Sequence, residues 1–320
     1  MTETQENNTR KRLLEIFAMV NMDSLPAMSE HVTELISLLG SSRATAQEVA
    51  NTVLKDYSLT TRILQLVNSA YYSRGTPVST ISRAITVVGF DTLRQLAATM
   101  ALFEEFMRTG TEKDEIAGAF TMSLISATQS RIYCELKKNP RLSSEEAYIC
   151  TLLHNLGKLV VLVYLPAQYQ AVEQHMQKGY SEDHSARLVL KDLTYSQIGR
   201  EISTFWNFSK RIVDCMDTDP PKPEKSRDAF LLLQNLVVFS NQLTSSFFNG
   251  TKLELTDLMY KFGTILEIGQ EEALTLVDRS LGVCENYSKT MRDGLDKIQR
   301  GRLNQITVSK DPSGRWVRLS

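Results

Sequence analysis

The sequence predicts an all-α protein. Apolar residues recur three or four positions apart along most of the chain, which is the spacing that lines one face of a helix. No segment alternates apolar and polar residues over the length of a strand. Capping residues, glycines and prolines divide the periodic segments into separate helices.

The N-terminal part of the chain predicts a series of short helices. Thr45 and Glu48 have the spacing of a capping box, which starts a helix that continues to Leu54. Gly89 ends another short helix, and Asp91 caps the helix that follows. The predicted helices cover residues 13–20, 32–39, 45–54, 58–67, 81–88 and 91–103.

The rest of the chain predicts longer helices and an irregular tail. The apolar stretch Ser144–Tyr164 predicts one continuous helix, which Pro166 ends. Three prolines within residues 217–225 predict a surface loop. Residues 301–320 show little periodicity, so we expect an irregular tail with a hairpin at most. The predicted helices cover residues 116–136, 144–164, 172–176, 186–190, 194–206, 210–216, 229–248 and 271–298.

Composition and charge narrow the class of protein. The chain has 320 residues, a formal net charge of −1 and 42% hydrophobic residues, which suffices for one large helical domain or two smaller ones. Because there is no basic excess, we expect no nucleic-acid partner. The four cysteines are widely spaced and form no C-x-x-C pair, which indicates buried reduced thiols and no zinc site.

The sequence also lacks recognisable targeting signals. Residues 1–12 are polar and charged, unlike a signal peptide. The longest apolar runs, such as residues 159–165, are much shorter than the roughly 20 residues of a membrane span. We therefore expect a cytoplasmic protein with no membrane partner.

Several motifs occur in an order typical of one family. They are Leu25-Pro-Ala-Met28, residues 50–59 ending in Lys-Asp-Tyr-Ser-Leu, residues 61–72 ending in Asn-Ser-Ala-Tyr-Tyr, residues 81–89, and Leu-Leu-His-Asn-Leu-Gly-Lys-Leu-Val over residues 152–160. Together they resemble the HDOD domain family, clearly over residues 25–216. This resemblance implies an all-α fold and a role in signal transduction, without an established general enzymatic activity.

The resemblance also relates the C-terminal half of the domain to the HD phosphohydrolases. Those enzymes bind one or two divalent metals through histidines and an adjacent His-Asp pair, and the metal polarises phosphate and activates water. In this sequence the pair becomes His154-Asn155, and an amide is a weaker ligand than a carboxylate. The other ligand positions correspond to Met122, Tyr195 and Met216. The resemblance therefore implies no bound metal, no cofactor and no hydrolysis by the family mechanism.

The same region supplies a candidate site for a ligand or partner. The pocket expected there is either a relic of the active site or a sensing site. Its predicted residues are Met122, His154, Asn155, Lys158 and Tyr195. A histidine on an apolar helix is more often a core residue than a metal ligand. A lysine such as Lys158 is more often solvated or ion-paired than bound to phosphate.

Two further groups are weighed as sites. Asn68 and Tyr71 interrupt a helix near a glycine, so they either satisfy freed backbone groups or form a recognition surface. A metal cluster of Asp183, His184 and Asp192 is conceivable, although surface capping by Asp183 explains that segment more simply.

The predicted organisation has four parts. They are an N-terminal helix over residues 1–22, an HDOD domain over residues 23–248, a C-terminal helical extension over residues 249–300 and the irregular tail over residues 301–320. We expect a non-enzymatic regulatory module that contacts signalling proteins or senses a small nucleotide-like ligand. Two alternatives stay open: a divergent metal-dependent phosphohydrolase acting on a nucleotide or cyclic dinucleotide, and a module that forms homo-oligomers only.

Overall fold

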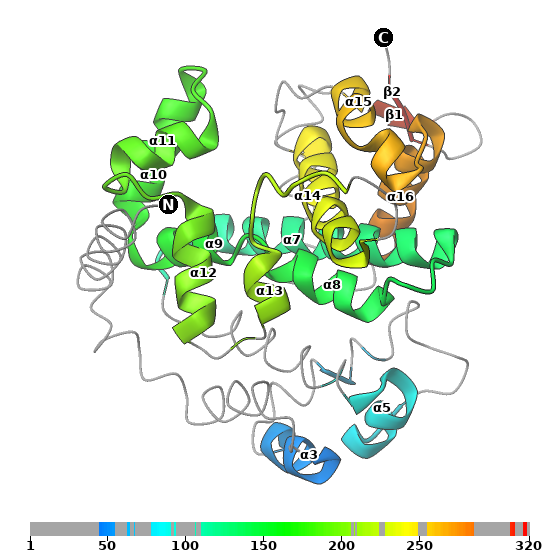
Figure 1. Cartoon of the computed structure of the whole chain (residues 1–320). Coiled ribbons are helices and arrows are strands. Elements are labelled where there is room, and N and C mark those ends of the chain that lie inside the picture. The colour runs from blue at the N-terminus through cyan, green and yellow to red at the C-terminus, as the bar shows by residue number, and fades with distance from the viewer. Residues whose placement is uncertain are drawn as a thin grey trace. The chain divides into compact units, whose positions relative to one another are not determined.

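The chain is all-α, as its periodicity predicts (Figure 1). The structure is a computed structural model that describes residues 45–54, 63–64, 67, 78–90, 93, 106, 110–205, 208, 210–223, 228–248, 255–284, 308–310 and 316–318. In these residues the only strands are β1 (Val308–Lys310) and β2 (Trp316–Arg318), which pair antiparallel within the tail. The tail therefore forms the hairpin that the sequence analysis allowed.

The chain forms two compact units, each assembled from segments that are distant in sequence. Unit 1 comprises residues 1–63, 80–116 and 155–216, and unit 2 comprises residues 64–79, 117–154 and 217–320. Among the described residues, the helices of unit 1 are α3 (Ala46–Leu54), α5 (Ile81–Val88), α9 (Leu156–Tyr164), α10 (Pro166–Gln177), α11 (Glu182–Val189), α12 (Tyr195–Phe205) and α13 (Lys210–Asp214). Those of unit 2 are most of α7 (Lys113–Lys137), α8 (Ser144–Leu153), α14 (Ala229–Phe248), α15 (Leu255–Leu266) and α16 (Gln270–Cys284).

Local sequence signals set the ends of the short helices in unit 1. The Glu48 carboxylate accepts a hydrogen bond from the Thr45 N–H at 2.7 Å, and the Thr45 hydroxyl accepts one from the Glu48 N–H at 3.3 Å. This is the predicted capping box at the start of α3. Thr80 caps α5 in the same way, and Gly89 ends it with a positive φ of 86° that favours glycine. The predicted helix over residues 81–88 is thus confirmed.

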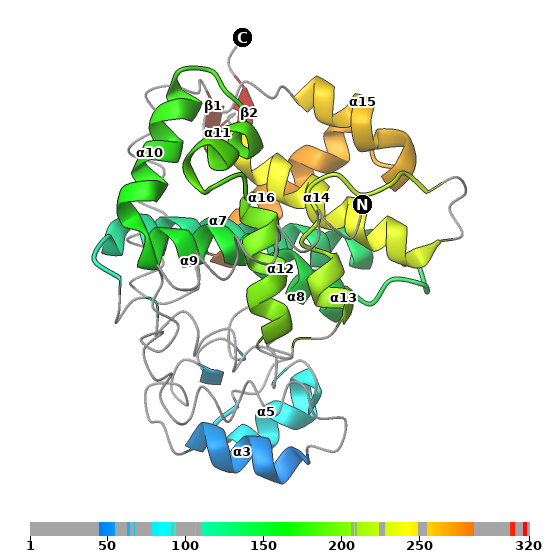
Figure 2. The same cartoon turned by 60° about the vertical axis from the view of Figure 1, so that its left-hand side comes forward.

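Helices α9 and α12 approach each other so closely that their backbones touch (Figures 1 and 2). A Cβ atom on Gly157 would lie 2.0 Å from the Tyr195 carbonyl oxygen and 2.6 Å from the Gly199 nitrogen. A Cβ on Gly199 would lie 3.0 Å from the Gly157 nitrogen. Only glycines fit at this crossing, and it fixes the position of α9 on α12.

The predicted single helix over residues 144–164 is wrong in one respect. α8 ends at Leu153 and α9 begins at Leu156, because the backbone of Asn155 leaves the helical region with φ −93° and ψ 18°. The interruption falls where the chain passes from unit 2 to unit 1, so the two halves pack on different partners. α8 packs on α14, and α9 packs on α12.

The apolar stretch that contains this interruption is buried within the protein. Residues 146–164 are long and apolar enough to cross a membrane by length and composition alone, with a mean hydropathy of 1.4. However, 83% of that window is buried. This is how the core helix of a soluble protein behaves, so the stretch is weak evidence for a membrane span.

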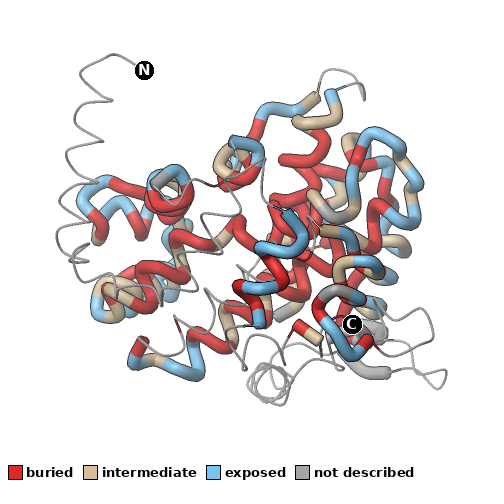
Figure 3. The backbone as a smooth tube through the Cα atoms, turned by 90° about the horizontal axis from the view of Figure 1, so that it is seen from below, coloured by how far each residue is buried: buried red, intermediate tan, exposed pale blue. Residues whose placement is uncertain are grey.

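The core of unit 2 joins α7 to the helices that follow residue 228. Most residues of α7 and α14 are buried. Figure 3 shows the buried residues of the described backbone in red. Phe239 of α14 meets Phe262 of α15 edge to face, with ring centroids 5.7 Å apart. The buried Gln129 side chain accepts a hydrogen bond from Thr244 at 3.1 Å and donates one to Ser280 at 3.5 Å. Helix α15 itself was not predicted from the sequence.

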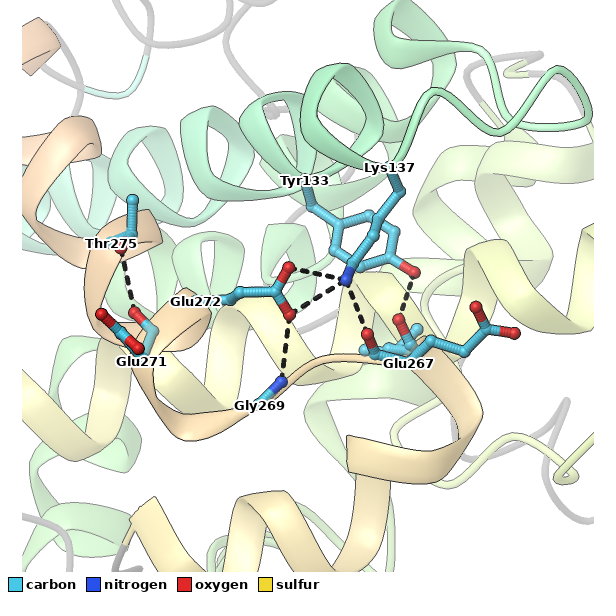
Figure 4. A network of polar contacts seen from close by, with 8 residues as sticks. Tyr133, Lys137, Glu267, Gly269, Glu271, Glu272 and Thr275 are labelled. Atoms are coloured by element: carbon cyan, nitrogen blue, oxygen red, sulfur yellow. Dashed lines mark hydrogen bonds and ion pairs between the residues drawn. The ribbon is translucent and has the colours of Figure 1, made fainter.

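A polar network ties the C-terminal end of α7 to the connection between α15 and α16 (Figure 4). The Tyr133 hydroxyl donates to the Leu266 carbonyl at 2.7 Å. Lys137 donates to the Glu267 carbonyl at 2.6 Å and to both carboxylate oxygens of Glu272 at 2.7 and 2.9 Å. The same carboxylate accepts from the Gly269 N–H at 3.1 Å and so caps α16.

Candidate functional site

The predicted site residues fall into three groups in the structure. Lys158 and Tyr195 come together in unit 1, with the Lys158 ammonium 5.7 Å from the centre of the Tyr195 ring. Asn155 also belongs to unit 1, whereas Met122 and His154 belong to unit 2. Asn68 and Tyr71 lie outside the described residues, so their predicted role stays a prediction.

Lys158 of α9 is held by two carboxylates from the neighbouring helices. Its ammonium lies 2.5 Å from Glu182 at the start of α11 and 3.4 Å from Glu173 of α10. Burial by itself lowers the pKa of Lys158, but the carboxylates, led by Glu182, outweigh burial and hold that pKa well above its ordinary value. Lys158 is therefore the permanently charged centre of an ion-pair network.

Two tyrosines flank the same ammonium. The Tyr169 ring centre lies 5.8 Å from Lys158 Nζ on one side, and the Tyr195 ring lies on another. Burial raises the pKa of both phenols, although the nearby ammonium opposes the rise. Both therefore stay protonated at neutral pH. The cation sits against two aromatic faces, an arrangement that stabilises positive charge.

The hydroxyl of Tyr195 has no hydrogen-bond partner among the described residues, although the side chain is only 6% exposed. A buried hydroxyl without a partner is costly, and such groups are uncommon in folded proteins. The Glu173 Oε1 atom is likewise buried without a hydrogen-bond partner in the described part of the chain. Two buried polar atoms without a hydrogen-bond partner in the described residues thus belong to side chains beside Lys158.

The His-Asn pair lies at the junction of α8 and α9. His154 is 7% exposed and forms the C-terminal cap residue of α8. Asn155 heads α9; its carbonyl accepts from the Leu159 N–H at 3.1 Å, but its side chain does not cap the helix. Met122 is half-buried on α7.

Met216 is built into the packing of unit 1. Its side chain is fully buried. The Met216 sulfur accepts a hydrogen bond from Ser203 at 3.4 Å, and its carbonyl accepts one from Ser196 at 2.6 Å. Both serines belong to α12, so this residue fastens the end of the α13 segment to that helix.

The residues at the inherited ligand positions do not fit a divalent metal. Apart from His154 they offer two thioethers, an amide and a protonated phenol, none of which supplies the negative charge that such a cation requires. No group of three or more His, Cys, Asp or Glu residues suited to a metal occurs among the described residues. Asp183, His184 and Asp192, which the sequence analysis weighed as a metal cluster, therefore form no such group. Ser181, and not Asp183, caps α11 through the His184 N–H.

Sequence reasoning missed three members of the Lys158 network. Tyr169 and Glu173 are four positions apart on α10, so a shared helix face could have been read from their spacing. Glu182 lies 24 positions from Lys158, and no local pattern connects the two. Its role depends on the packing of α11 beside α10 (Figures 1 and 2).

Comparison with known proteins identifies the family. The HDOD domain family matches residues 25–219. The chain belongs to the HDOD family. A curated relative, an uncharacterized protein of Treponema pallidum (strain Nichols), is 22% identical over 238 residues. That match covers 72% of this chain but only 44% of the relative, so the chain spans less than half of the relative's length.

Solved structures show the same fold at low identity. An HDOD domain protein of unknown function from Geobacter sulfurreducens superposes with a TM-score of 0.60 at 18% identity, covering 92% of this chain and 96% of that one. A Shewanella amazonensis SB2B protein, provisionally named a phosphohydrolase, superposes with a TM-score of 0.64 at 19% identity, covering 89% of this chain and 97% of that one. A Marinobacter aquaeolei VT8 protein, provisionally named a signal transduction protein, superposes with a TM-score of 0.62 at 17% identity, covering 91% of this chain and 66% of that one.

Proposed function

We propose that this HDOD protein is a non-enzymatic, cytoplasmic regulatory module that acts through contacts with signalling proteins or by sensing a small ligand. The observation that carries the proposal is the environment of Lys158. In an HD phosphohydrolase a lysine at this position could contact phosphate. Here its ammonium is neutralised by Glu182 and Glu173, so it is not available to attract an anion.

The inherited metal positions support the same proposal. Met216 packs on α12 and accepts a hydrogen bond from Ser203, and Tyr195 is protonated and buried. Neither can replace an anionic or imidazole ligand at a site that activates water. His154 would be the one remaining ligand of the family set, and the other residues of that set are uncharged. Catalysis by the phosphohydrolase route would therefore lack both its Lewis acid and its nucleophile.

The names of the structural relatives point in two directions. The Marinobacter protein's provisional name accords with a regulatory role, and the Shewanella protein's provisional name is the reason to test hydrolysis directly. At under 20% identity these structures support the fold only, so the proposal depends on the residues of this chain.

The experiment measures metal content and hydrolysis on the same purified protein. We expect inductively coupled plasma mass spectrometry to find far less than one Mn, Fe, Ni or Zn per chain. We also expect no turnover of nucleotides or cyclic dinucleotides with any of these metals added. Near-stoichiometric metal, or metal-dependent hydrolysis that is lost in His154→Ala, would overturn the proposal.

The nature of the partner is tested separately. Light scattering and pull-downs from the native cell separate an adaptor from a module that only self-associates. An adaptor captures a signalling protein at defined stoichiometry, whereas a homo-oligomer captures only copies of itself. A small-molecule sensor shows neither and binds its ligand directly.

A further inference from the structure

The network around Lys158 has an excess of negative charge. One ammonium faces the carboxylates of Glu173 and Glu182. The positive charge of Lys158 is therefore more than balanced. The local potential repels phosphate and attracts a further cation.

The hydrogen-bonding capacity of Glu173 and Tyr195 indicates which kind of ligand they can bind. Glu173 Oε1 lies 3.4 Å from Lys158 Nζ, which is an ion-pair contact, but it accepts no hydrogen bond from any described residue. A carboxylate oxygen can only accept. The Tyr195 hydroxyl, also without a partner in the described residues, can donate or accept. A group that satisfies both must donate to Glu173 Oε1, as every ammonium or guanidinium can, whereas the negative charge of phosphate is repelled by the carboxylates.

The Tyr195 ring lies beside this network, with the Lys158 ammonium 5.7 Å from its centre. Burial raises the pKa of the Tyr195 phenol most, while Lys158 lowers that pKa and Glu182 and Glu173 raise it. The network reaches the surface at its carboxylates, because the side chains of Glu173 and Glu182 each keep 37% of their exposure, whereas the Tyr195 hydroxyl and Glu173 Oε1 atoms are themselves buried. A ligand therefore enters beside the two carboxylates and has to displace the groups that cover these two atoms.

We propose that the Lys158 cluster, formed by Lys158, Tyr169, Glu173, Glu182 and Tyr195, binds a cationic nitrogen group, either an ammonium or a guanidinium. The bound group donates to Glu173 Oε1 and to the Tyr195 hydroxyl oxygen, and the tyrosine rings stabilise its charge. This inference rests on the proposed regulatory function and replaces the nucleotide-like ligand expected at this position with a cationic one. The cation is supplied by a free amine or by a basic side chain of a partner.

Calorimetric titration of the full chain tests the charge and the donors of the ligand separately. The probes are agmatine and spermidine, with tetramethylammonium as a cation that has no N–H donor and inorganic phosphate as an anion. We expect saturable binding of the two amines, at least tenfold weaker binding of tetramethylammonium, and none of phosphate. Phosphate binding, or equal binding of tetramethylammonium, would overturn the proposal.

Two variants and two matched controls locate the site. Tyr195→Phe removes one expected hydrogen bond, and Glu173→Gln removes the negative charge of the other acceptor, so each variant should weaken agmatine binding about tenfold. Tyr133→Phe and Glu272→Gln make the same chemical changes in the other lysine–glutamate network and should leave binding unchanged. Tyr195→Phe removes no existing hydrogen bond to a described residue, so it tests the site even if Glu173→Gln misfolds. Amine binding that survives Tyr195→Phe would contradict the assignment.

A blocked tripeptide with a central arginine distinguishes the two sources of the cation. A docking site for a partner's side chain binds the tripeptide and agmatine alike, whereas a small-amine sensor binds agmatine only. If neither binds, the cationic site is refuted, but the non-enzymatic function still stands on the metal and hydrolysis measurements. Conversely, metal-dependent turnover would refute that function whatever the amines do.

Discussion

Two buried tyrosines of this protein illustrate how similar side chains can contribute differently to stability. The Tyr133 hydroxyl donates to the Leu266 carbonyl and thereby joins α7 to the end of α15. The Tyr195 hydroxyl makes no hydrogen bond within the described residues, although it is equally well shielded from water. The first arrangement satisfies two buried polar groups, and the second leaves one unsatisfied. This difference is the reason why we propose Tyr195, and not Tyr133, as part of a binding site.

The matched variants should separate these two cases. Tyr133→Phe leaves the Leu266 carbonyl without its donor, so we expect the free energy of unfolding to fall by about 1–2 kcal/mol. Tyr195→Phe removes a polar atom that has no partner, so we expect little change or a small gain in the free energy of unfolding. Urea unfolding followed by circular dichroism measures both. An equal loss in the two variants would mean that Tyr195 is already satisfied in the free protein.

Lys158→Met tests the ion-pair network at the level of one charge. The variant leaves the Glu173 and Glu182 carboxylates without the cation that both contact, and both are partly screened by solvent. We therefore expect a loss of about 1–3 kcal/mol in the free energy of unfolding at pH 7. The double variant Lys158→Met/Glu182→Gln should recover part of the lost free energy of unfolding, as measured by urea unfolding. No loss in the single variant would show that solvent already screens the pair.

The contribution of the Lys158 charge to the free energy of unfolding depends on pH in a definite direction. The pKa of Lys158 is raised in the folded protein, so its stabilising contribution is fully present below the unfolded pKa of about 10.4. It is lost only as pH rises through the higher folded value. The stability difference between the wild type and Lys158→Met should therefore stay level from about pH 7 to pH 10. A decline within that range would contradict the raised pKa.

At the scale of single helices, the crossing of α9 and α12 gives a sharp contrast between two glycines. A Cβ on Gly157 meets backbone atoms at 2.0 and 2.6 Å, and backbone cannot rotate away. Gly157→Ala should therefore force the helices apart and cost about 1–3 kcal/mol or more. Gly118 lies within α7 with no atom within 4 Å of its added Cβ, so Gly118→Ala should gain about 0.5–1 kcal/mol from helix propensity. Thermal and urea unfolding measure both. Equal effects would exclude a backbone contact at Gly157.

The start of α16 depends on the carboxylate of Glu272. The hydrogen bond from Lys137, followed by that from the Gly269 N–H, holds the pKa of Glu272 below its ordinary value. A lowered pKa gives stability that is present above the unfolded pKa of about 4.3 and is lost as pH falls through the folded value. Glu272→Gln should therefore be less stable than the wild type at neutral pH, and the difference should disappear on acidification. Urea unfolding at a series of pH values checks this. A difference independent of pH would indicate a steric effect.

The elements show which features the sequence could predict. The capping box at Thr45 and the stop at Gly89 depend on neighbouring residues only, and both were predicted correctly. The interruption at Asn155 was missed, because it depends on α8 and α9 having different packing partners. Helix α15 carries buried apolar residues at helical spacing, namely Leu255, Leu258, Phe262 and Leu266, so its periodicity could have predicted it.

The candidate site shows the same limit. His154, Asn155 and Lys158 follow from one local motif, and Tyr195 from its position after it. The carboxylates that determine the charge of the site come from α10 and α11, and only the packing of those helices brings them to Lys158. The sequence identified the lysine, but its charge balance is a property of the fold.

At the scale of the whole molecule, the family match and the compact units have different limits. The HDOD match ends at residue 219. Unit 2 continues beyond it, because α7 and α8 form one core with α14, α15 and α16. The contacts are specific: Gln129 bonds Thr244 and Ser280, and Asn241 of α14 donates to the Thr151 carbonyl of α8 at 3.4 Å. The helices after residue 228 thus complete a core that begins inside the family domain.

A chain cut after residue 219 tests this dependence. Truncation removes α14 to α16 and so exposes the apolar face of α7 and α8, while Tyr133 and Lys137 lose their partners. An exposed apolar face of that kind cannot be compensated by the helices that remain in unit 2. We therefore expect the amide hydrogens of residues 117–153 to exchange far faster in the truncated chain than in the full chain, with a gain in binding of a hydrophobic dye. If those amides kept their protection, α7 and α8 would be stabilised within the family domain itself. The C-terminal helices would then be an accessory to the HDOD fold and not part of its core.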